Sequence, residues 1–231
     1  MIAKCGEERI WHWAHLGRHL CDPWWENETE WHRAWKGLFP RNWQERVQHA
    51  DNGEKHIADV KTDHGWVIEF QHSHIKFEER RSRGDFYKKL VWVVDGTRRT
   101  RDGAQFARAW EDLGIAINKD GTVREIFPSE CRLVRDWLVS DAPVLFDFGG
   151  EHLLWWLHAK SPDGKAYVAK FSRREFIDTQ RSGGFDERVK GFGNLVTQYE
   201  SNRREQEEMR AIYRADAFQQ WLYQRRPRRR F

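Results

Sequence analysis

Apolar and polar residues alternate through residues 57–61 and again through 66–71, which predicts two β-strands joined by a turn at 62–65. The turn sequence, Thr-Asp-His-Gly, consists of residues that favour turns. Side chains alternate between the two faces of a strand, so Glu69 and Gln71 are expected to point the same way. The hairpin therefore gathers polar groups on one face.

Asp59 lies on the first of these strands, and its position depends on the turn. A four-residue loop places Asp59 beside Ile68, whereas a loop one residue longer places it directly across from Glu69. In both registers two carboxylates lie side by side and repel each other unless a cation lies between them. Magnesium is commonly held by one or two carboxylates, waters and a substrate phosphate. The alternative is an acidic hairpin face exposed to solvent, but the apolar run at 91–94 and the hydrophobic hairpin itself favour burial.

The pattern on either side of the hairpin predicts an α/β fold. Residues 24–39 are expected to form a helix that is capped by Asn27, ends at Pro40 and buries a stripe of apolar residues at helical spacing. Further strands are expected within 43–49 and at 90–95, with a charged helix at 77–90 between the hairpin and the last strand. The order helix, three strands, helix, strand predicts a mixed sheet with one helical crossover.

The second half of the chain carries a different pattern. A helix at 100–113 and a short strand at 115–118 are expected to close the first domain. From 143 onward, strand-like runs with turns at 149–150 and 162–164 predict a small antiparallel β-unit, whose aromatic residues form a core or, alternatively, a platform for stacking bases. The predicted division is an N-terminal cap at 1–23, a central domain at 24–128, a β-rich unit at 129–190, and a charged helix with a basic tail at 191–231.

Composition narrows the class of protein. Of the 231 residues 39% are hydrophobic, including 14 Trp and 14 Phe, which indicates a folded protein. No apolar run is long enough to span a bilayer and no signal-peptide pattern is present, so no membrane partner and a cytoplasmic location are expected. The three cysteines are too few and odd in number for a secreted disulfide framework. The oligomeric state stays open.

Positive charge is concentrated at the C-terminus. The net charge is +4, and residues 203–231 contain nine Arg against four acidic residues. Arg228, Arg229 and Arg230 in the final RRPRRRF are expected to contact DNA phosphates without reading sequence, with an affinity that salt weakens. The alternative is a solvated terminus.

Two further groups of residues have metal- or phosphate-binding chemistry. Cys5, His12, His15 and Cys21 follow the pattern C-x6-H-x2-H-x5-C, which offers four zinc ligands but is not an established finger spacing; the alternative is packed histidines and free thiols. In the first helix a second stripe runs along one face at i, i+4 and i+8. The stripe contains Glu28, His32 and Lys36. It forms either a salt-bridged face exposed to solvent or the lining of a phosphate-binding cleft beside the hairpin.

The segments HIADV, IEFQHS, EERRSRGDFY and VWVVDG, in this order, resemble the competence protein CoiA family, whose core is similar to the PD-(D/E)XK, or restriction-endonuclease-like, nucleases. The resemblance covers roughly residues 1–96. It implies a restriction-endonuclease-like core with a mixed central sheet flanked by helices, here followed by a small C-terminal α+β unit. It also implies that Asp59 and Glu69 are metal ligands and that Gln71 stands where the commoner pattern has lysine. The N-terminal HxxH resembles the end of the zinc-ribbon-like segment of that family, without its upstream cysteine pair.

The function implied is hydrolysis of DNA phosphodiester bonds with Mg²⁺ or Mn²⁺, with weak sequence preference, in DNA processing of the competence or recombination type. Gln71 is expected to orient the attacking water. Lys36 or Lys61 is expected to supply the positive charge that a glutamine lacks, and Lys36 and Arg83 to position phosphates.

Glu28, in line with His32, is expected to complete the metal shell or to position the nucleophile. Two alternatives remain at this point: a non-catalytic DNA-binding or DNA-processing protein that keeps the nuclease fold, and a nuclease effector of phage defence with the same chemistry but a different trigger.

Overall fold

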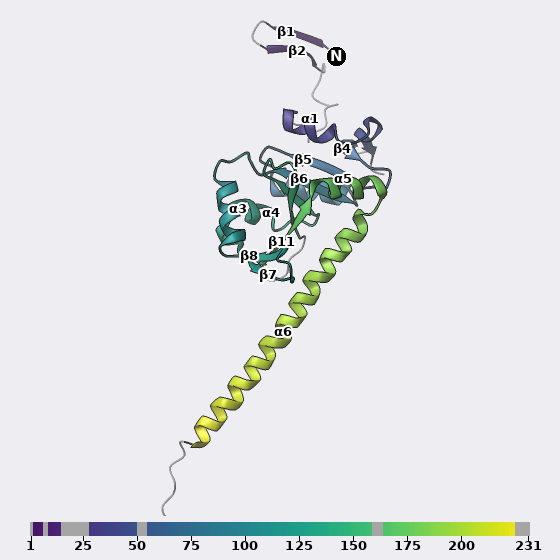
Figure 1. Ribbon diagram of the computed structural model, residues 1–231. Coiled ribbons are helices and arrows are strands. Elements are labelled where there is room, and N and C mark those ends of the chain that lie inside the picture. Colours follow the sequence, from purple (N-terminus) through teal and green to yellow (C-terminus); the bar gives the residue numbers. More distant parts are fainter. Residues whose placement is uncertain (1, 7–8, 15–27, 50–54, 159–163, 225–231) are drawn as a thin grey trace, which may run out of the picture. The chain divides into compact units, whose positions relative to one another are not determined.

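The computed structural model describes residues 2–6, 9–14, 28–49, 55–158 and 164–224, with side chains described for 28–49, 55–158 and 164–221. The chain divides into two compact units, Met1–Phe185 and Asp186–Phe231, and each is described by itself. The first unit contains the sheet and the candidate site (Figure 1).

The first unit is built around a nine-stranded mixed sheet. The strands, in their order across the sheet, are β3 (Gln44–His49), β4 (Lys55–Lys61), β5 (Val67–Gln71), β6 (Leu90–Asp95), β9 (Val144–Asp147), β10 (Leu153–Leu157), β11 (Ala166–Ser172), β8 (Val123–Ile126) and β7 (Ile115–Ala116). The central strands β5, β6 and β9 are parallel, and every other neighbouring pair is antiparallel. The predicted α/β class with a mixed sheet is confirmed.

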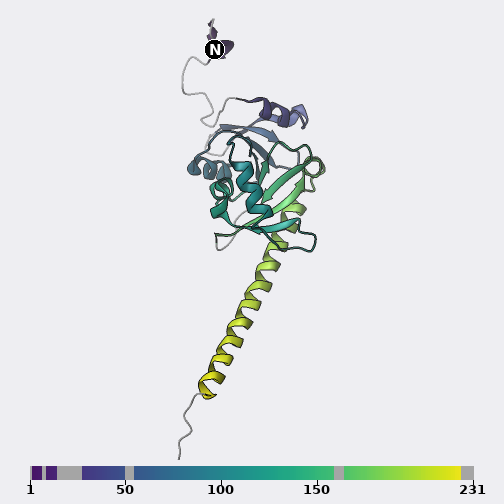
Figure 2. The same ribbon diagram turned by 60° about the vertical axis from the view of Figure 1, so that its left-hand side comes forward.

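Helices cover the sheet from both sides, as Figures 1 and 2 show. They are α1 (Glu30–Lys36), α2 (Phe77–Phe86), α3 (Asp102–Glu111), α4 (Arg132–Trp137) and α5 (Arg173–Ser182), with short 3-10 turns at Arg41–Trp43 and Pro128–Glu130. On one face Trp35 of α1 stacks on Phe70 of β5 and meets Phe176 of α5 edge-on. On the other face Trp137 of α4 packs against Trp92 of β6. The sheet therefore has an aromatic core on each side.

The parallel centre follows from the apolar runs in the sequence. All residues of β5 and β6 are buried, as expected for strands covered on both faces. Strand β5 continues through α2 into β6, which pairs with it in parallel, so the predicted helical crossover is confirmed.

The strands predicted as a small β-unit after residue 143 are antiparallel to one another, but they are not separate from the rest. Strand β9 pairs with β6, and β11 pairs with β8, so strands from 24–128 and 129–190 share one sheet. Their sequence explains this arrangement, because all four residues of β9, Val-Leu-Phe-Asp, are buried and need cover on both faces and neighbours on both edges.

Several helix boundaries differ from the prediction; α1 ends at Lys36 instead of residue 39, and α2 at Phe86 instead of residue 90. Thr29, and not Asn27, caps α1, which therefore begins at Glu30. The stretch 181–184, predicted as a linker, is the turn between α5 and α6 (Phe185–Gln224), where Gly183 adopts φ 81°. A Cβ at Gly183 would approach the His64 ring at 2.7 Å, so both the backbone conformation and the close packing require glycine.

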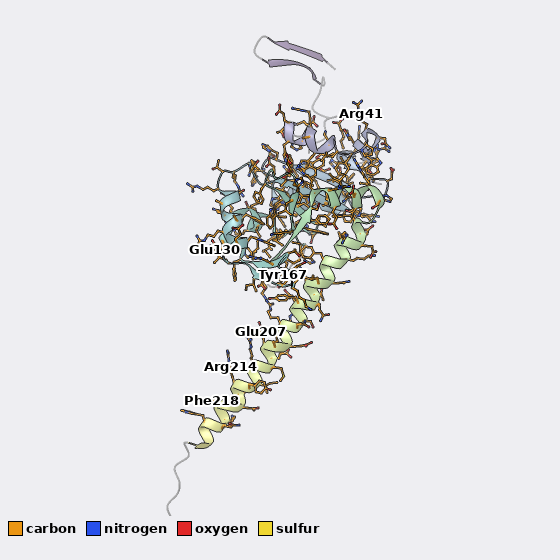
Figure 3. The ribbon with its side chains drawn as sticks, in the orientation of Figure 1. Arg41, Glu130, Tyr167, Glu207, Arg214 and Phe218 are labelled. Carbon is orange, nitrogen blue, oxygen red and sulfur yellow. The ribbon has the colours of Figure 1, made fainter. Side chains whose placement is uncertain are left out.

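The described part of the second unit is the remainder of α6; the whole helix has 40 residues and starts ten residues before the predicted 195. Figure 3 labels Glu207, Arg214 and Phe218 along it, and all three are exposed. No helix among the described residues is both long and apolar enough to cross a membrane.

The N-terminal strands β1 (Ile2–Gly6) and β2 (Arg9–Ala14) form an antiparallel hairpin. Cys5 lies on β1 and His12 on β2, but their side chains are outside the described ones. His15 and Cys21 lie outside the described residues altogether, and so does the tail with Arg228, Arg229 and Arg230. The zinc site and the tail's DNA contacts remain predictions.

Candidate functional site

The register of the β4–β5 hairpin brings the two predicted carboxylates together. Val60 pairs with Ile68 and Lys61 with Val67, so the loop contains five residues, closed by a 2.8 Å hydrogen bond from Thr62 N to Trp66 O. Continued by one position, this register sets Asp59 across from Glu69. The longer of the two predicted loops is therefore the one that forms.

Asp59 is held at the point where the β4–β5 pairing ends. Its Oδ2 accepts a 2.9 Å hydrogen bond from the backbone N–H of Phe70, so a side chain takes the place of a backbone partner in the ladder. Burial of the carboxyl group raises its pKa, while the Phe70 N–H and the positive charges of Lys36 and Arg83 act in the opposite direction. Asp59 is thus surrounded by cationic side chains from α1 and α2.

Glu69 is buried, with only 4% of its surface exposed, so the hairpin's acidic face does not face solvent. Its Oε2 accepts a 2.7 Å hydrogen bond from Arg83 Nη1, and Arg83 Nη2 donates to Glu79 at 2.6 Å. Its Oε1 is buried and has no hydrogen-bond partner among the described residues. Burial and the nearby charge of Asp59 raise the pKa of Glu69 to about 8, although Arg83 opposes the shift.

His32 connects α1 to the centre of the hairpin. The Thr29 N–H donates to its Nδ1 at 3.4 Å, and its Nε2 lies 2.6 Å from the carbonyl oxygen of Phe70. A carbonyl oxygen only accepts, so Nε2 carries the proton and Nδ1 is the acceptor. Phe70 is therefore held from two sides, by Asp59 at its N–H and by His32 at its carbonyl.

Lys36 lies one turn further along α1 and is also buried. Its Nζ forms ion pairs with Glu28 and, at 2.9 Å, with Glu45. Burial lowers its pKa, but these two carboxylates and the charge of Asp59 together raise it above its ordinary value. The predicted stripe thus contains a salt bridge between Glu28 and Lys36, and its cationic end is close enough to Asp59 to influence it.

The other predicted site residues near Asp59 and Glu69 make different contacts. Gln71 is 2% exposed, and its Nε2 donates to the carbonyl and hydroxyl oxygens of Ser73, each at 3.2 Å. Lys61 donates to Gln48 at 2.5 Å. Arg83 was predicted to meet phosphates, but it is 5% exposed and bridges two carboxylates, because this side of α2 packs on the Glu69 face of β5.

Sequence reasoning missed two acidic residues at the ends of parallel strands. Asp95 ends β6 and holds His72 at 2.7 Å, and Asp147 ends β9 and is fully buried. The rule that ligands and polar groups collect at the carboxyl ends of parallel strands would have singled out Asp95, whereas Asp147 depends on the pairing of β9 with β6, which only the structure shows.

The donor set suits a hard divalent cation only in part. No group of three or more His, Cys, Asp or Glu side chains within the described part of the chain could hold a metal ion. Asp59 and Glu69 offer two carboxylates, and the unpartnered Oε1 of Glu69 is the kind of oxygen that Mg²⁺ binds. These residues fit Mg²⁺ when waters and a substrate phosphate supply the other ligands.

The raised pKa of Glu69 predicts a pH-dependent stability. Its ordinary pKa is 4.5 and burial raises it to about 8, so between these values the folded chain holds a proton that the unfolded chain has lost. This contribution to stability is complete below pH 4.5 and is lost as pH rises toward 8. We expect the free energy of unfolding of the wild type, relative to Glu69→Gln, to fall between these pH values in urea titrations without divalent cations. A difference that stays constant with pH would contradict the assigned shift.

In comparisons with known proteins, no family model, curated protein or solved structure matches this chain, so its function is inferred from the geometry of the site and from the motifs in its sequence.

Proposed function

We propose that the chain is a metal-dependent deoxyribonuclease that hydrolyses phosphodiester bonds of DNA. The observation that carries the proposal is the buried pair Asp59 and Glu69, with Glu69 Oε1 lacking a hydrogen-bond partner among the described residues. Two neighbouring carboxylates with raised pKa values are stabilised in their charged forms by a divalent cation. The motif order that resembles the CoiA family supports the same reading.

The metal, when bound by Asp59 and Glu69, would lower the pKa of a water and neutralise charge on the scissile phosphate. The protein's own contribution is to fix the two carboxylates. The backbone N–H of Phe70 donates to Asp59, and its carbonyl oxygen accepts from His32. Arg83 donates to one carboxylate oxygen of Glu69. The pair is thus preorganised by hydrogen bonds from three elements.

Lys36 supplies the positive charge that Gln71 cannot. Its ammonium group is buried and forms ion pairs with Glu28 and Glu45, and its charge also acts on Asp59. Gln71 is held by Ser73 and can orient a water only through its amide. In this arrangement Lys36 provides the positive charge of the lysine found in the commoner pattern, and Gln71 occupies the strand position of that lysine.

DNA would be bound through its phosphate groups by positively charged side chains, without contacts that read the bases. Lys61 and the arginine tail at 225–231 would meet phosphates, so affinity would fall steeply with salt and sequence preference would be weak. The tail lies outside the described residues, and its role follows from the sequence alone.

A second candidate is a DNA-binding or DNA-processing protein that keeps this arrangement without cleavage. The ion pair between Arg83 and Glu69 favours it, because a buried guanidinium already neutralises one of the two carboxylates. The two candidates share DNA binding and differ only in the role of the metal.

Cleavage of supercoiled plasmid and of linear single- and double-stranded DNA, with Mg²⁺, Mn²⁺ or EDTA, tests the proposal. We expect cleavage with either metal and a loss of about 100-fold or more in Asp59→Asn, since removing a metal ligand removes several kcal/mol of charge stabilisation. Asp63→Asn, an exposed change in the adjacent turn, is the matched control. Lys36→Ala should also reduce cleavage, and an unchanged rate would exclude its role.

Two outcomes decide between the candidates. Cleavage that persists in EDTA, or that Asp59→Asn leaves intact, excludes the metal-dependent mechanism. DNA binding without cleavage under any of these conditions favours the non-catalytic protein.

A further inference from the structure

A pocket with a volume of about 210 Å³ opens where β5 and β6 end. The loop after β5, the end of β6, and the helices α2, α3 and α4 all contribute to its lining. Neither Asp59 nor Glu69 lines it. In open α/β sheets, ligands bind in the crevice beyond the carboxyl ends of parallel strands, which is the position of this pocket.

Three guanidinium groups line the pocket, and two of them have no hydrogen bond to a carboxylate. Arg99 is neutralised by Asp102 at 2.7 Å and Asp136 at 3.1 Å. Arg80 donates only to the main-chain carbonyl of Asp136, at 2.6 Å, and its Nε is buried without a partner among the described residues. Arg98 is exposed and has no acidic partner in the described part of the chain. The carboxylates of Asp95, Asp102 and Asp136 also line the pocket, so the positive charge offered to an anion is local, at Arg80 and Arg98.

The partial burial of Arg80 is a further reason to expect a bound anion. Its guanidinium lies over the Trp137 ring, 4.6 Å from the ring centroid, and burial lowers its pKa although Asp136 opposes the shift. An arginine stays charged in such a setting, so it is a cation that has lost part of its hydration. A bound anion would restore the lost interactions.

His72 adds a hydrogen-bonding nitrogen with a fixed role. Its Nδ1 lies 2.7 Å from Asp95 Oδ2, and the other Asp95 oxygen accepts from the backbone N–H and the hydroxyl of Thr97 at 2.8 and 2.6 Å. Because an ionised carboxylate only accepts, the His72 Nδ1 carries a proton. No described residue hydrogen-bonds to its Nε2, which is left for a ligand of the pocket.

One part of the lining is apolar, next to the polar Ser73 and His74. Phe77, Val94, Leu133 and Trp137 provide it, from α2, β6 and α4. A free phosphate ion would leave this wall in contact with water, whereas a ligand with a planar apolar body would cover it. The pocket thus matches a molecule with an anionic head and a ring.

We propose that this pocket binds a nucleoside monophosphate. Arg98 and Arg80 contact the phosphate, whose charge matches the two guanidinium groups without carboxylate hydrogen bonds, and Nε2 of His72, which accepts, hydrogen-bonds to a hydroxyl of the sugar. The base packs on the apolar wall beside Trp137. The pocket is separate from the Asp59–Glu69 pair, so nucleotide binding does not depend on a metal ion or on cleavage.

Isothermal titration calorimetry of the full chain in EDTA tests the proposal, with deoxyadenosine monophosphate, deoxyadenosine and inorganic phosphate as probes. We expect the nucleotide to bind at one site, about tenfold or more tighter than either of its parts, because only the nucleotide uses both the cations and the apolar wall. Arg98→Ala, an exposed change that leaves the core intact, should weaken nucleotide binding about tenfold or more. Arg174→Ala, an exposed arginine of α5, is the matched control and should bind like the wild type.

The proposal is overturned if the nucleotide does not bind, if Arg98→Ala binds it as the wild type does, or if inorganic phosphate binds as tightly as the nucleotide. Asp59→Asn should bind the nucleotide unchanged, even though it is expected to lose cleavage. Failure of the pocket proposal and failure of the nuclease proposal can therefore be told apart.

Discussion

Replacing Arg83 with methionine is expected to lower the free energy of unfolding by about 3–5 kcal/mol above pH 8, where Glu69 is ionised, as breaking a buried ion pair by removing one partner does. Arg83 is 5% exposed and donates to Glu69 at 2.7 Å and to Glu79 at 2.6 Å. Without it, Glu69 and Asp59 would face each other with a cation fewer, and the pKa of Glu69 would rise further. Methionine keeps much of the side-chain volume, so the loss measures charge more than packing.

The pH dependence of this loss identifies its cause. Protonation of Glu69 removes its repulsion with Asp59, so the destabilisation should grow as pH rises above about 8, the pKa of Glu69 in the folded wild type, and shrink as pH falls through that value. If the pair also binds Mg²⁺, the added metal should raise the midpoint of unfolding more in Arg83→Met than in the wild type. Urea unfolding at several pH values, with and without Mg²⁺, measures both effects.

Arg81→Met provides the matched control, because Arg81 is an exposed arginine of the same helix and its replacement should change stability by less than about 0.5 kcal/mol. A stability of Arg83→Met within that margin would show that the ion pair contributes nothing. A loss that does not vary with pH would assign it to packing instead of charge.

The hairpin and the crossover could be predicted because their signals are local. The turn formers at 62–65 and the alternation on either side fix two strands, and the apolar run of β6 after a charged helix fixes the parallel return. The sequence left two loop lengths open, four residues and five, and the 2.8 Å hydrogen bond from Thr62 N to Trp66 O shows that the loop has five. The fifth residue sets Asp59 across from Glu69.

The surroundings of the pair could not be predicted, because they depend on which residues of other elements face β5. Arg83 is one of several arginines on α2, and only the packing of that helix shows that it is the buried one. His32 was recognised as part of a helical stripe, but its bond to the Phe70 carbonyl depends on how α1 lies on the sheet. Long-range pairing of this kind leaves no periodic pattern in the sequence.

The position of β9 was missed for the same reason. Its apolar residues were assigned to a separate β-unit, whereas it pairs with β6 at the centre of the sheet. This placement brings Asp147 under α1 and α5, where it is fully buried. The residue thus connects the second half of the chain to the helix that carries His32 and Lys36.

Replacing Asp147 with alanine is expected to lower the free energy of unfolding by about 3–5 kcal/mol, because one buried and three partly buried donors lose their acceptor. Asp147 Oδ2 accepts from the indole nitrogens of Trp31 and Trp35 at 3.0 and 2.8 Å and from Arg173 at 2.6 Å, while Oδ1 accepts from the Gly149 N–H at 2.9 Å. The guanidinium of Arg173, which lies over the Trp35 ring, would be left without its carboxylate. Urea unfolding followed by tryptophan fluorescence measures the loss.

The change should also act on the candidate site, since α1 is tied to β9 by this one carboxylate and to β5 by His32. Amide hydrogen exchange across α1 should therefore be faster in Asp147→Ala than in the wild type, at conditions where the rest of the sheet is still protected. Asp178→Ala, which removes an exposed carboxylate of α5, is the control and should change neither stability nor exchange. If Asp147→Ala lowers stability while exchange in α1 stays as slow as in the wild type, the other contacts of α1 with the sheet are sufficient to hold it in place. The position of Lys36 beside Asp59 then does not depend on β9.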